Sequence, residues 1–93
     1  MSVKIIKLIT GEDVIADVEI VENEYVVKKG FRLGLTQQGI MMIPFCPFSK
    51  DDEFKINKDN VLFICDPESE IETEYRNQTS DIITASGPII ARV

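Results

Sequence analysis

Histidine and tryptophan are absent from this 93-residue chain, and it contains only two cysteines, Cys46 and Cys65. Without histidine no Ser-His-Asp set can form, and neither cysteine has the base that usually activates a thiol nucleophile. Two sulfurs alone cannot complete a tetrahedral zinc site. A disulfide would need an oxidising compartment, which nothing in the sequence indicates. We therefore expect two reduced thiols buried in strands, and neither a catalytic set, a metal nor a cofactor.

Long apolar runs are also missing, since none approaches the ~20 residues of a membrane-spanning helix. The N-terminus, MSVKIIKL, shows neither a basic-then-apolar signal nor a cleavage site, so we expect a cytoplasmic protein with no membrane partner. Hydrophobic residues make up 44% of the chain and charged residues 28%, which is typical of one small globular domain. The net charge of −6 disfavours non-specific coating of nucleic acid, because the average surface repels phosphate.

The clearest pattern is the alternation from Asp13 to Glu22, where Val14, Ala16, Val18 and Ile20 share one side. The acidic residues Asp17 and Glu19 fall on the other side. This pattern predicts a central strand with one buried face. The flanking sequence predicts a first strand over Val3–Ile9 and a third over Tyr25–Leu35, with Gly30 marking a bulge or bend.

The segment Ile40–Phe48 does not alternate and is apolar on both sides, although it contains Pro44 and Pro47. Two apolar faces indicate a covered strand, whereas proline belongs at an edge or a bulge. A free apolar edge would promote aggregation. We therefore expect an oligomer held by strand addition through Ile40–Phe45. The alternative is that the C-terminal segment of the same chain folds back over this surface.

The remaining barrel elements follow a charged loop at Ser49–Glu53. Phe54–Ile56 is expected to complete the hairpin begun by Ile40–Phe48. Asn57–Asn60 is rich in residues that tolerate left-handed backbone and predicts a tight turn. Val61–Cys65 is then the last short strand.

Asp66 as N-cap and Pro67 at the first helical position predict a helix from Pro67 to about Thr79. Its apolar stripe is thin and consists of Ile71, Tyr75 and Ile82. The row of Glu68, Glu70, Glu72 and Glu74 is typical of a solvated face. Ile89–Val93 is expected to form either a short edge strand or a loose tail.

Together these elements predict a mainly β fold. Residues 1–65 would form a five-stranded, bent antiparallel SH3-like barrel. Residues 66–93 would form a helix and tail packed on the barrel or on a neighbouring subunit.

Two segments form a recognisable pair of motifs. In the first, Gly11 opens the strand, Val21 takes an apolar position, and Glu22 follows it. The second is INKDNVLFI at Ile56–Ile64. With these motifs the chain resembles the Sm/LSm family, which includes bacterial Hfq, and its short length without a catalytic set suits a small phage-encoded member. The family usually has Asp at the position of Glu22, and its second motif reads roughly Ile-Arg-Gly-Asp-Asn-Val-Val-Tyr-Ile. The family's RNA-contacting Asn corresponds to Val26, and its Arg-Gly corresponds to Asn57-Lys58.

The resemblance implies a closed homo-oligomeric ring of about five to seven subunits, in which the fourth strand of one subunit pairs with the fifth of the next. The residues expected at this subunit interface are Met41, Met42, Ile43, Phe45, Val61 and Phe63. The resemblance also implies that the loops Glu22–Glu24 and Asn57–Asn60 meet near the pore.

At that meeting point Tyr25 could stack on a base, Asn57 could hydrogen-bond a base edge, and Lys58 could contact phosphate. A second basic cluster, Lys28, Lys29 and Arg32, lies along the third strand. The alternative for all of these residues is structural, with Tyr25 in the core and the charges serving as solvated surface.

Two functions remain open. The first is a ring-forming protein that binds single-stranded nucleic acid, RNA or DNA. The second is an oligomeric structural or adaptor module that binds protein and no nucleic acid, which the acidic surface favours. An enzyme is the weakest hypothesis, because the adjacent acids Asp51, Asp52 and Glu53 lie on a loop too flexible for a rigid cation site.

Overall fold

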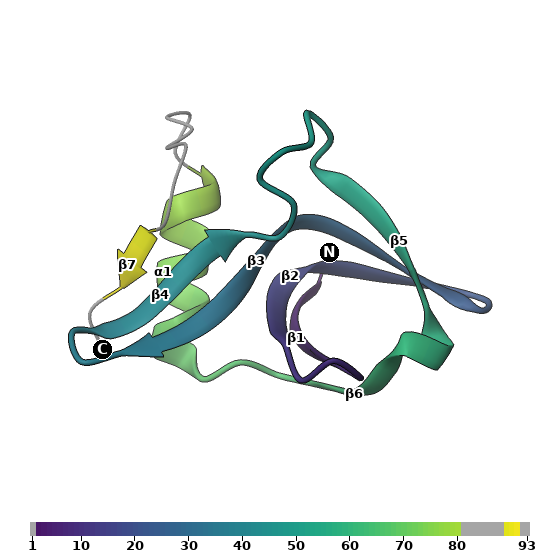
Figure 1. Cartoon of the computed structure of the whole chain (residues 1–93), viewed down its shortest axis with the longest axis horizontal. Coiled ribbons are helices and arrows are strands. Elements are labelled where there is room, and N and C mark those ends of the chain that lie inside the picture. Colours follow the sequence, from purple (N-terminus) through teal and green to yellow (C-terminus); the bar gives the residue numbers. More distant parts are fainter. Residues whose placement is uncertain (1, 81–88, 92–93) are drawn as a thin grey trace.

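All strands in the computed structural model of this chain belong to one antiparallel sheet (Figure 1), and the structure describes residues 2–80 and 89–91. The strands are β1 (Ser2–Leu8), β2 (Asp13–Val21), β3 (Glu24–Thr36), β4 (Gly39–Pro44), β5 (Glu53–Asn57), β6 (Val61–Cys65) and β7 (Ile89–Ala91). A short 3₁₀ turn, η1 (Lys58–Asn60), joins β5 to β6, and the helix α1 (Ser69–Ser80) follows β6. The prediction of a mainly β fold with a C-terminal helix is confirmed.

The strand order is β6-β1-β2-β3-β4-β7, and β5 pairs separately with β3. The first part of β3 pairs with β5, from Glu24 opposite Asn57 to Lys28 opposite Glu53, and the second part pairs with β4. The sequence predicted that Phe54–Ile56 completes a hairpin with the Ile40–Phe48 segment. This prediction is wrong, because Phe54–Ile56 pairs with β3 instead. The described sheet has seven strands, because β5 is separate from β4 and β7 adds a further strand outside the predicted barrel. Among the described residues the sheet does not close on itself.

A β-bulge in β3 separates its two partners. Lys29 and Gly30 together stand opposite Ala16 of β2, and Lys29 has a φ of 53°. A Cβ atom at Gly30 would lie 3.1 Å from Cγ1 of Val27 and 3.5 Å from Cγ1 of Val14, so this close contact favours glycine. The predicted bulge or bend at Gly30 is confirmed, because the register of β3 against β2 shifts there.

Strand β2 is buried on both faces over Val14–Val18, which corrects the prediction of one buried face. Val14, Ala16 and Val18 lie in a first core cluster that also includes residues of β1 and β3. Ile15, on the opposite face, lies in a second cluster with Met42 of β4 and residues of α1. The second face is covered because α1 packs on it, as Figure 1 shows behind β3 and β4.

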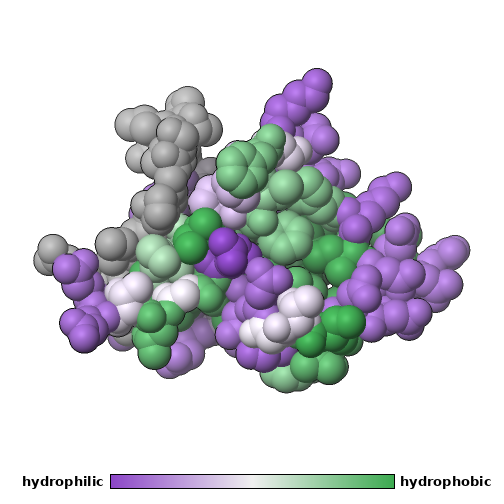
Figure 2. Space-filling model, in the orientation of Figure 1, coloured by the Kyte–Doolittle hydropathy of each residue, from purple (hydrophilic) through white to green (hydrophobic). Residues whose placement is uncertain are grey.

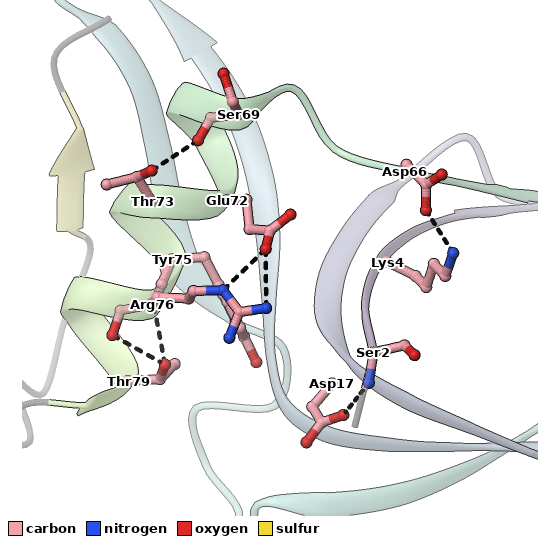
Figure 3. Close-up of polar contacts among 10 residues, drawn as sticks. All are labelled: Ser2, Lys4, Asp17, Asp66, Ser69, Glu72, Thr73, Tyr75, Arg76 and Thr79. Carbon is pink, nitrogen blue, oxygen red and sulfur yellow. Dashed lines mark hydrogen bonds and ion pairs between the residues drawn. The ribbon is translucent and has the colours of Figure 1, made fainter.

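Asp17 was expected on a solvated face but is buried. Its carboxylate accepts a hydrogen bond from the Ser2 amide at 3.1 Å, so the buried charge has a polar partner (Figure 3). Ile20, expected in the core, is exposed. The reason is that β1 pairs with β2 only as far as Val18, so the β2–β3 hairpin extends beyond the core.

Helix α1 begins two residues later than predicted. Asp66 does not cap it but forms an ion pair with Lys4 of β1 (Figure 3), and the Glu68 carbonyl accepts the first helical bond from the Glu72 amide at 2.9 Å. Ile71 and Tyr75 are buried as predicted, and they pack on the sheet of their own chain. Ile82, the third residue of the predicted stripe, lies outside the described residues.

Two of the three glutamates of α1 form contacts along the helix. Glu72 pairs with Arg76 at 2.8 Å, and the Glu74 carboxylate accepts a hydrogen bond from the side-chain Nε2 of Gln78 at 3.0 Å. Such i, i+4 pairs stabilise a helix weakly, which suits a segment whose apolar stripe is thin.

Tyr75 connects α1 to the bulge. Its side chain reaches from α1 toward the sheet (Figure 3), and its hydroxyl donates hydrogen bonds to the carbonyl of Lys29 at 2.9 Å and of Lys28 at 3.3 Å. Its ring also makes an edge contact with Phe31, at 6.1 Å between centroids. Burial raises the pKa of Tyr75 from 10.0 to about 12, although the backbone of Asp17 opposes this shift.

Tyr75→Phe should lower the free energy of unfolding by about 1–2 kcal/mol, because a carbonyl at the bulge loses a buried donor. It should also change the alkaline stability. The folded phenol keeps its proton up to about 12 while the unfolded phenol loses it from about 10.0, so wild-type stability falls as the pH rises through that range. Urea unfolding on either side of this range measures both effects.

The control for this measurement is Tyr25→Phe, which keeps the Tyr75 hydroxyl and should retain the alkaline fall. A Tyr75→Phe protein whose stability falls as steeply as that of the wild type would contradict this account of the bulge.

The outer edge of β4 is paired within the chain. Ile40 lies opposite Ala91, and Met42 lies opposite Ile89 of β7. For residues 40–42 the structure therefore shows the second alternative from the sequence analysis, in which the C-terminal segment of the same chain covers the apolar run. Ile89–Ala91 forms a short edge strand, and residues 92 and 93 lie outside the described part of the chain.

Met42 was expected at a subunit interface, but its side chain is 0% exposed and packs in the second core cluster. Met42→Lys should therefore unfold the protein rather than release folded monomers. A lysine buried without a partner costs several kcal/mol, which is comparable with the whole stability of a small domain. Circular dichroism during thermal unfolding measures the loss.

The matched control is Leu35→Lys, because Leu35 is 88% exposed and this change should alter stability by no more than about 0.5 kcal/mol. A cooperatively folded Met42→Lys protein would show that the second cluster is not a core.

Candidate nucleic-acid interface

The two loops that the resemblance placed near each other do meet in the structure. Pairing between β3 and β5 aligns Glu24 with Asn57 and Tyr25 with Ile56. Beyond this ladder the Lys58 amide donates a hydrogen bond to the Asn23 carbonyl at 3.0 Å. The β2–β3 turn and η1 are therefore held together by the backbone, and they form one surface within a single chain.

Tyr25 and Lys58 are in contact on this surface. The Lys58 ammonium lies 5.4 Å from the centroid of the Tyr25 ring, which is cation–π distance. The ring is half-buried and packs against the first core cluster. Tyr25 thus has a structural role on its inner side and carries a lysine over its ring.

Asn57 serves as the N-cap of η1. Its Oδ1 accepts a hydrogen bond from the Asp59 amide at 2.9 Å, so the acceptor half of the side-chain amide is used inside the turn. In residues 2–80 and 89–91 no hydrogen bond engages the Nδ2 group. The geometry therefore leaves Asn57 as a donor for an external acceptor such as a base carbonyl.

We call the surface formed by Tyr25, Asn57 and Lys58 the loop cluster. Its surroundings are acidic. Glu22, Glu24 and Asp59 are close to these residues in the sequence, and all three side chains are exposed. Val26, which aligns with the family's RNA-contacting Asn, is buried and cannot reach a ligand.

The second predicted basic cluster does not extend the loop cluster. Lys28 lies at the opposite end of the β3–β5 ladder and faces Glu53 at 3.9 Å, and Arg32, beyond the bulge, faces Glu12 at 3.4 Å. Lys29 is exposed and lies at the bulge between them. Carboxylates thus offset two of these three charges, so the basic residues do not form one continuous patch.

Of the residues predicted at a subunit interface, only Phe63 is strongly exposed, at 54%. Phe45 packs against the first core cluster and contacts Phe54 at 5.8 Å between ring centroids, and Val61 packs in the same cluster. Met41 and Ile43 are half-buried. Leu62, beside Phe63, is 60% exposed and was not singled out from the sequence. The segment Val61–Cys65 is apolar without alternation, so at least one of its apolar side chains could have been expected on the outside.

A hollow of about 510 Å³ lies where β1 begins. Lys4 and Lys28 line it together with Asp17 and Glu19, so its charges balance. Among the residues that the structure describes, no group of three or more acidic or cysteine side chains could hold a metal ion. In that same part of the chain, no helix has the length and apolar character needed to cross a membrane.

No known family model matches the chain, and no curated protein matches it. The resemblance to the Sm/LSm family therefore rests on the motif residues themselves.

Both cysteines are exposed, which corrects the prediction of buried thiols. Cys46 follows the end of β4 rather than lying in a strand, and Cys65 ends β6 with its neighbour Ile64 packed inward. The prediction failed because Cys46 lies beyond the end of β4 and Cys65 is the last residue of β6.

Both thiols should therefore react in the native protein about as fast as in the denatured protein, because accessible thiolate controls the rate. A colorimetric thiol titration with and without denaturant measures this. The single variants Cys46→Ser and Cys65→Ser assign each phase, and protection of either thiol in the native state would contradict the exposed position.

Proposed function

We propose that this chain is an Sm-like module that binds single-stranded nucleic acid, RNA in the first place, through the loop cluster. The observation that carries the proposal is the contact between Lys58 and Tyr25 across the joined turns. An aromatic ring, a cation and an amide donor on one exposed surface are the groups by which proteins hold unpaired bases and their phosphates.

The finer fold assignment, a five-stranded SH3-like barrel of Sm type, belongs to this proposal. Residues of β1, β2, β3, β5 and β6 all pack in or against the first core cluster, so these strands surround one core. The turn η1 connects β5 to β6, which returns to pair with β1. The loop cluster then lies at one end of the barrel.

Binding at Tyr25 requires a base to replace Lys58 over the ring. A cation–π contact at an exposed site is worth ~0.5–1 kcal/mol, whereas a base stacked on an aromatic side chain is worth ~1–3 kcal/mol. The exchange is therefore favourable, and the released ammonium can contact the phosphate of the same nucleotide. Asn57 Nδ2 can donate to the edge of that base.

One loop cluster binds weakly, because it offers one stacking ring and its neighbours are acidic. Several copies acting on one strand would raise the affinity by effective concentration. A ring of about five to seven subunits is one such arrangement. Ring closure through β4 requires β7 to leave the edge that it occupies at Ile40–Met42.

The second candidate function is an oligomeric adaptor that binds protein and no nucleic acid. The pairing of Lys28 and Arg32 with carboxylates favours it, since these charges are offset before any phosphate approaches. The two candidates differ in whether the wild-type protein binds nucleic acid at all.

The test compares oligo-U and oligo-A binding to wild type, Lys58→Glu and Lys55→Glu at low and moderate salt. Both variants change the net charge from −6 to −8, because each replaces +1 by −1. Lys55 is exposed on β5 but lies outside the loop cluster. We expect Lys58→Glu to weaken binding at least about tenfold and Lys55→Glu by less than about threefold, with all affinities falling as salt rises.

If both variants weaken binding equally, the effect of Lys58→Glu comes from net charge alone and not from a contact between Lys58 and the nucleic acid. A wild-type protein that binds neither oligonucleotide at low salt would refute nucleic-acid binding and leave the adaptor function.

A further inference from the structure

The hollow where β1 begins has apolar walls as well as charged ones. Val18 and Ile20 of β2 and Ile64 of β6 line it beside the lysines and acids already described. Pairing between β1 and β2 ends where Ser2 lies opposite Val18, so the last part of β2 continues without β1 beside it. Side chains from both faces of β2 therefore border the hollow, acidic ones from one face and apolar ones from the other. Its volume of about 510 Å³ is within the range of small-molecule sites.

The charges that line this hollow sum to zero, but they do not pair with one another. Lys4 forms its ion pair with Asp66, and Figure 3 shows its side chain turned toward Asp66 rather than toward Asp17. The Lys28 ammonium faces Glu53 at 3.9 Å. Both lysines are thus engaged by carboxylates from outside the lining. The hollow together with these partners is therefore net negative.

Asp17 is the buried charge that this arrangement leaves without a cation. The residue is only 9% exposed, and its carboxylate accepts a hydrogen bond from the neutral Ser2 amide. Lys28 lies opposite Asp17 in the register of β2 and β3, but its ammonium reaches Glu53 instead. In the part of the chain that the structure describes, no lysine or arginine forms an ion pair with Asp17 or with Glu19. Because buried charges are ordinarily paired, this carboxylate at the wall of a hollow indicates a cationic ligand.

Glu19 offers a second carboxylate to the same cation. It lies two residues from Asp17 on the same face of β2, and its side chain is exposed. Beyond the hollow the β2–β3 hairpin carries the exposed acids Glu22 and Glu24, and Figure 2 shows hydrophilic surface at the hairpin tip that Figure 1 locates. The local field therefore favours a cation over an anion.

The lining also decides the class of cation. A hard metal ion needs more oxygen ligands than two carboxylates supply, and the described residues contain no group of three acidic or cysteine side chains that could hold one. An ammonium group, in contrast, has three N–H donors that two carboxylates can accept. The apolar walls suit an aliphatic body, and Ile20, which is 66% exposed, would lose contact with water beneath it.

We infer that this hollow binds a small primary aliphatic amine in its ammonium form. The ammonium lies between the carboxylates of Asp17 and Glu19, and the alkyl chain lies against Val18, Ile20 and Ile64. The site shares no residue with the loop cluster, so it does not depend on whether the loop cluster binds nucleic acid.

The test is a titration of the full ¹⁵N-labelled chain with n-pentylammonium chloride, followed by the amide shifts of Val18, Glu19 and Ile20. A ligand of this size binds weakly, so the titration extends to about 10 mM. The neutral comparison is 1-pentanol, which has the same carbon chain and no charge. We expect saturable shifts with n-pentylammonium and at least about tenfold weaker binding of 1-pentanol, because the alcohol cannot form charge-assisted hydrogen bonds.

Two matched variants separate the site from general attraction to an acidic protein. Glu19→Gln and Glu70→Gln both change the net charge from −6 to −5, but Glu70 is exposed on α1 and does not line the hollow. Glu19→Gln should weaken binding of n-pentylammonium at least about fivefold and Glu70→Gln less than about twofold. Asp17→Asn should weaken it as well. Because Glu19 is exposed, Glu19→Gln keeps the test valid even if the change at the buried Asp17 prevents folding.

Equal weakening by Glu19→Gln and Glu70→Gln would overturn the inference, and so would a wild-type protein that shows no saturable shifts. Binding of 1-pentanol as tight as that of n-pentylammonium would show a purely apolar contact. The same amide shifts on addition of magnesium chloride alone would show a site for inorganic cations. Either result would refute the assignment to an amine.

Discussion

The bulge at Lys29–Gly30 is the constraint on which the rest of the structure depends. It redirects β3, so that one part of the strand pairs with β5 and the next part pairs with β4. Glycine permits the tight approach to Val14 and Val27, and the Tyr75 hydroxyl satisfies the Lys29 carbonyl from the helix side. The bulge thus lies between the two core clusters, one on each face of β2, and the Tyr75 hydroxyl of α1 hydrogen-bonds to its backbone.

The same change of partner builds the loop cluster. Because the first part of β3 pairs with β5 rather than β4, the turn after β5 returns to the β2–β3 turn, and Lys58 comes over Tyr25. The acidic neighbours of this surface, and the ion pairs of Lys28 and Arg32 along β3, make it unlike a general phosphate-binding face. The nucleic-acid binding that we propose would therefore rest on contact with single bases rather than on strong electrostatic attachment.

The chain distributes its apolar residues unequally between the two ends of the sheet. At the β4 end, Met42 is buried under α1, and β7 pairs with the edge of β4. The most apolar run of the sequence is therefore largely covered by other segments of the same chain. At the β6 end, Leu62 and Phe63 remain exposed, and neither belongs to either core cluster.

The sequence alone determined the elements whose signals are local. The alternation in Asp13–Glu22, the bend at Gly30, the turn at Asn57–Asn60 and the buried pair Ile71 and Tyr75 all follow from periodicity or turn chemistry, and the motif match placed Tyr25, Asn57 and Lys58 in adjoining loops. Only the tertiary structure decided that β2 is covered on both faces, that both cysteines are exposed, and that β7 rather than another chain pairs with β4. The physical reason is that burial of a second face, and the partner of an edge strand, depend on segments distant in sequence, which leave no periodic signal in the strands they cover.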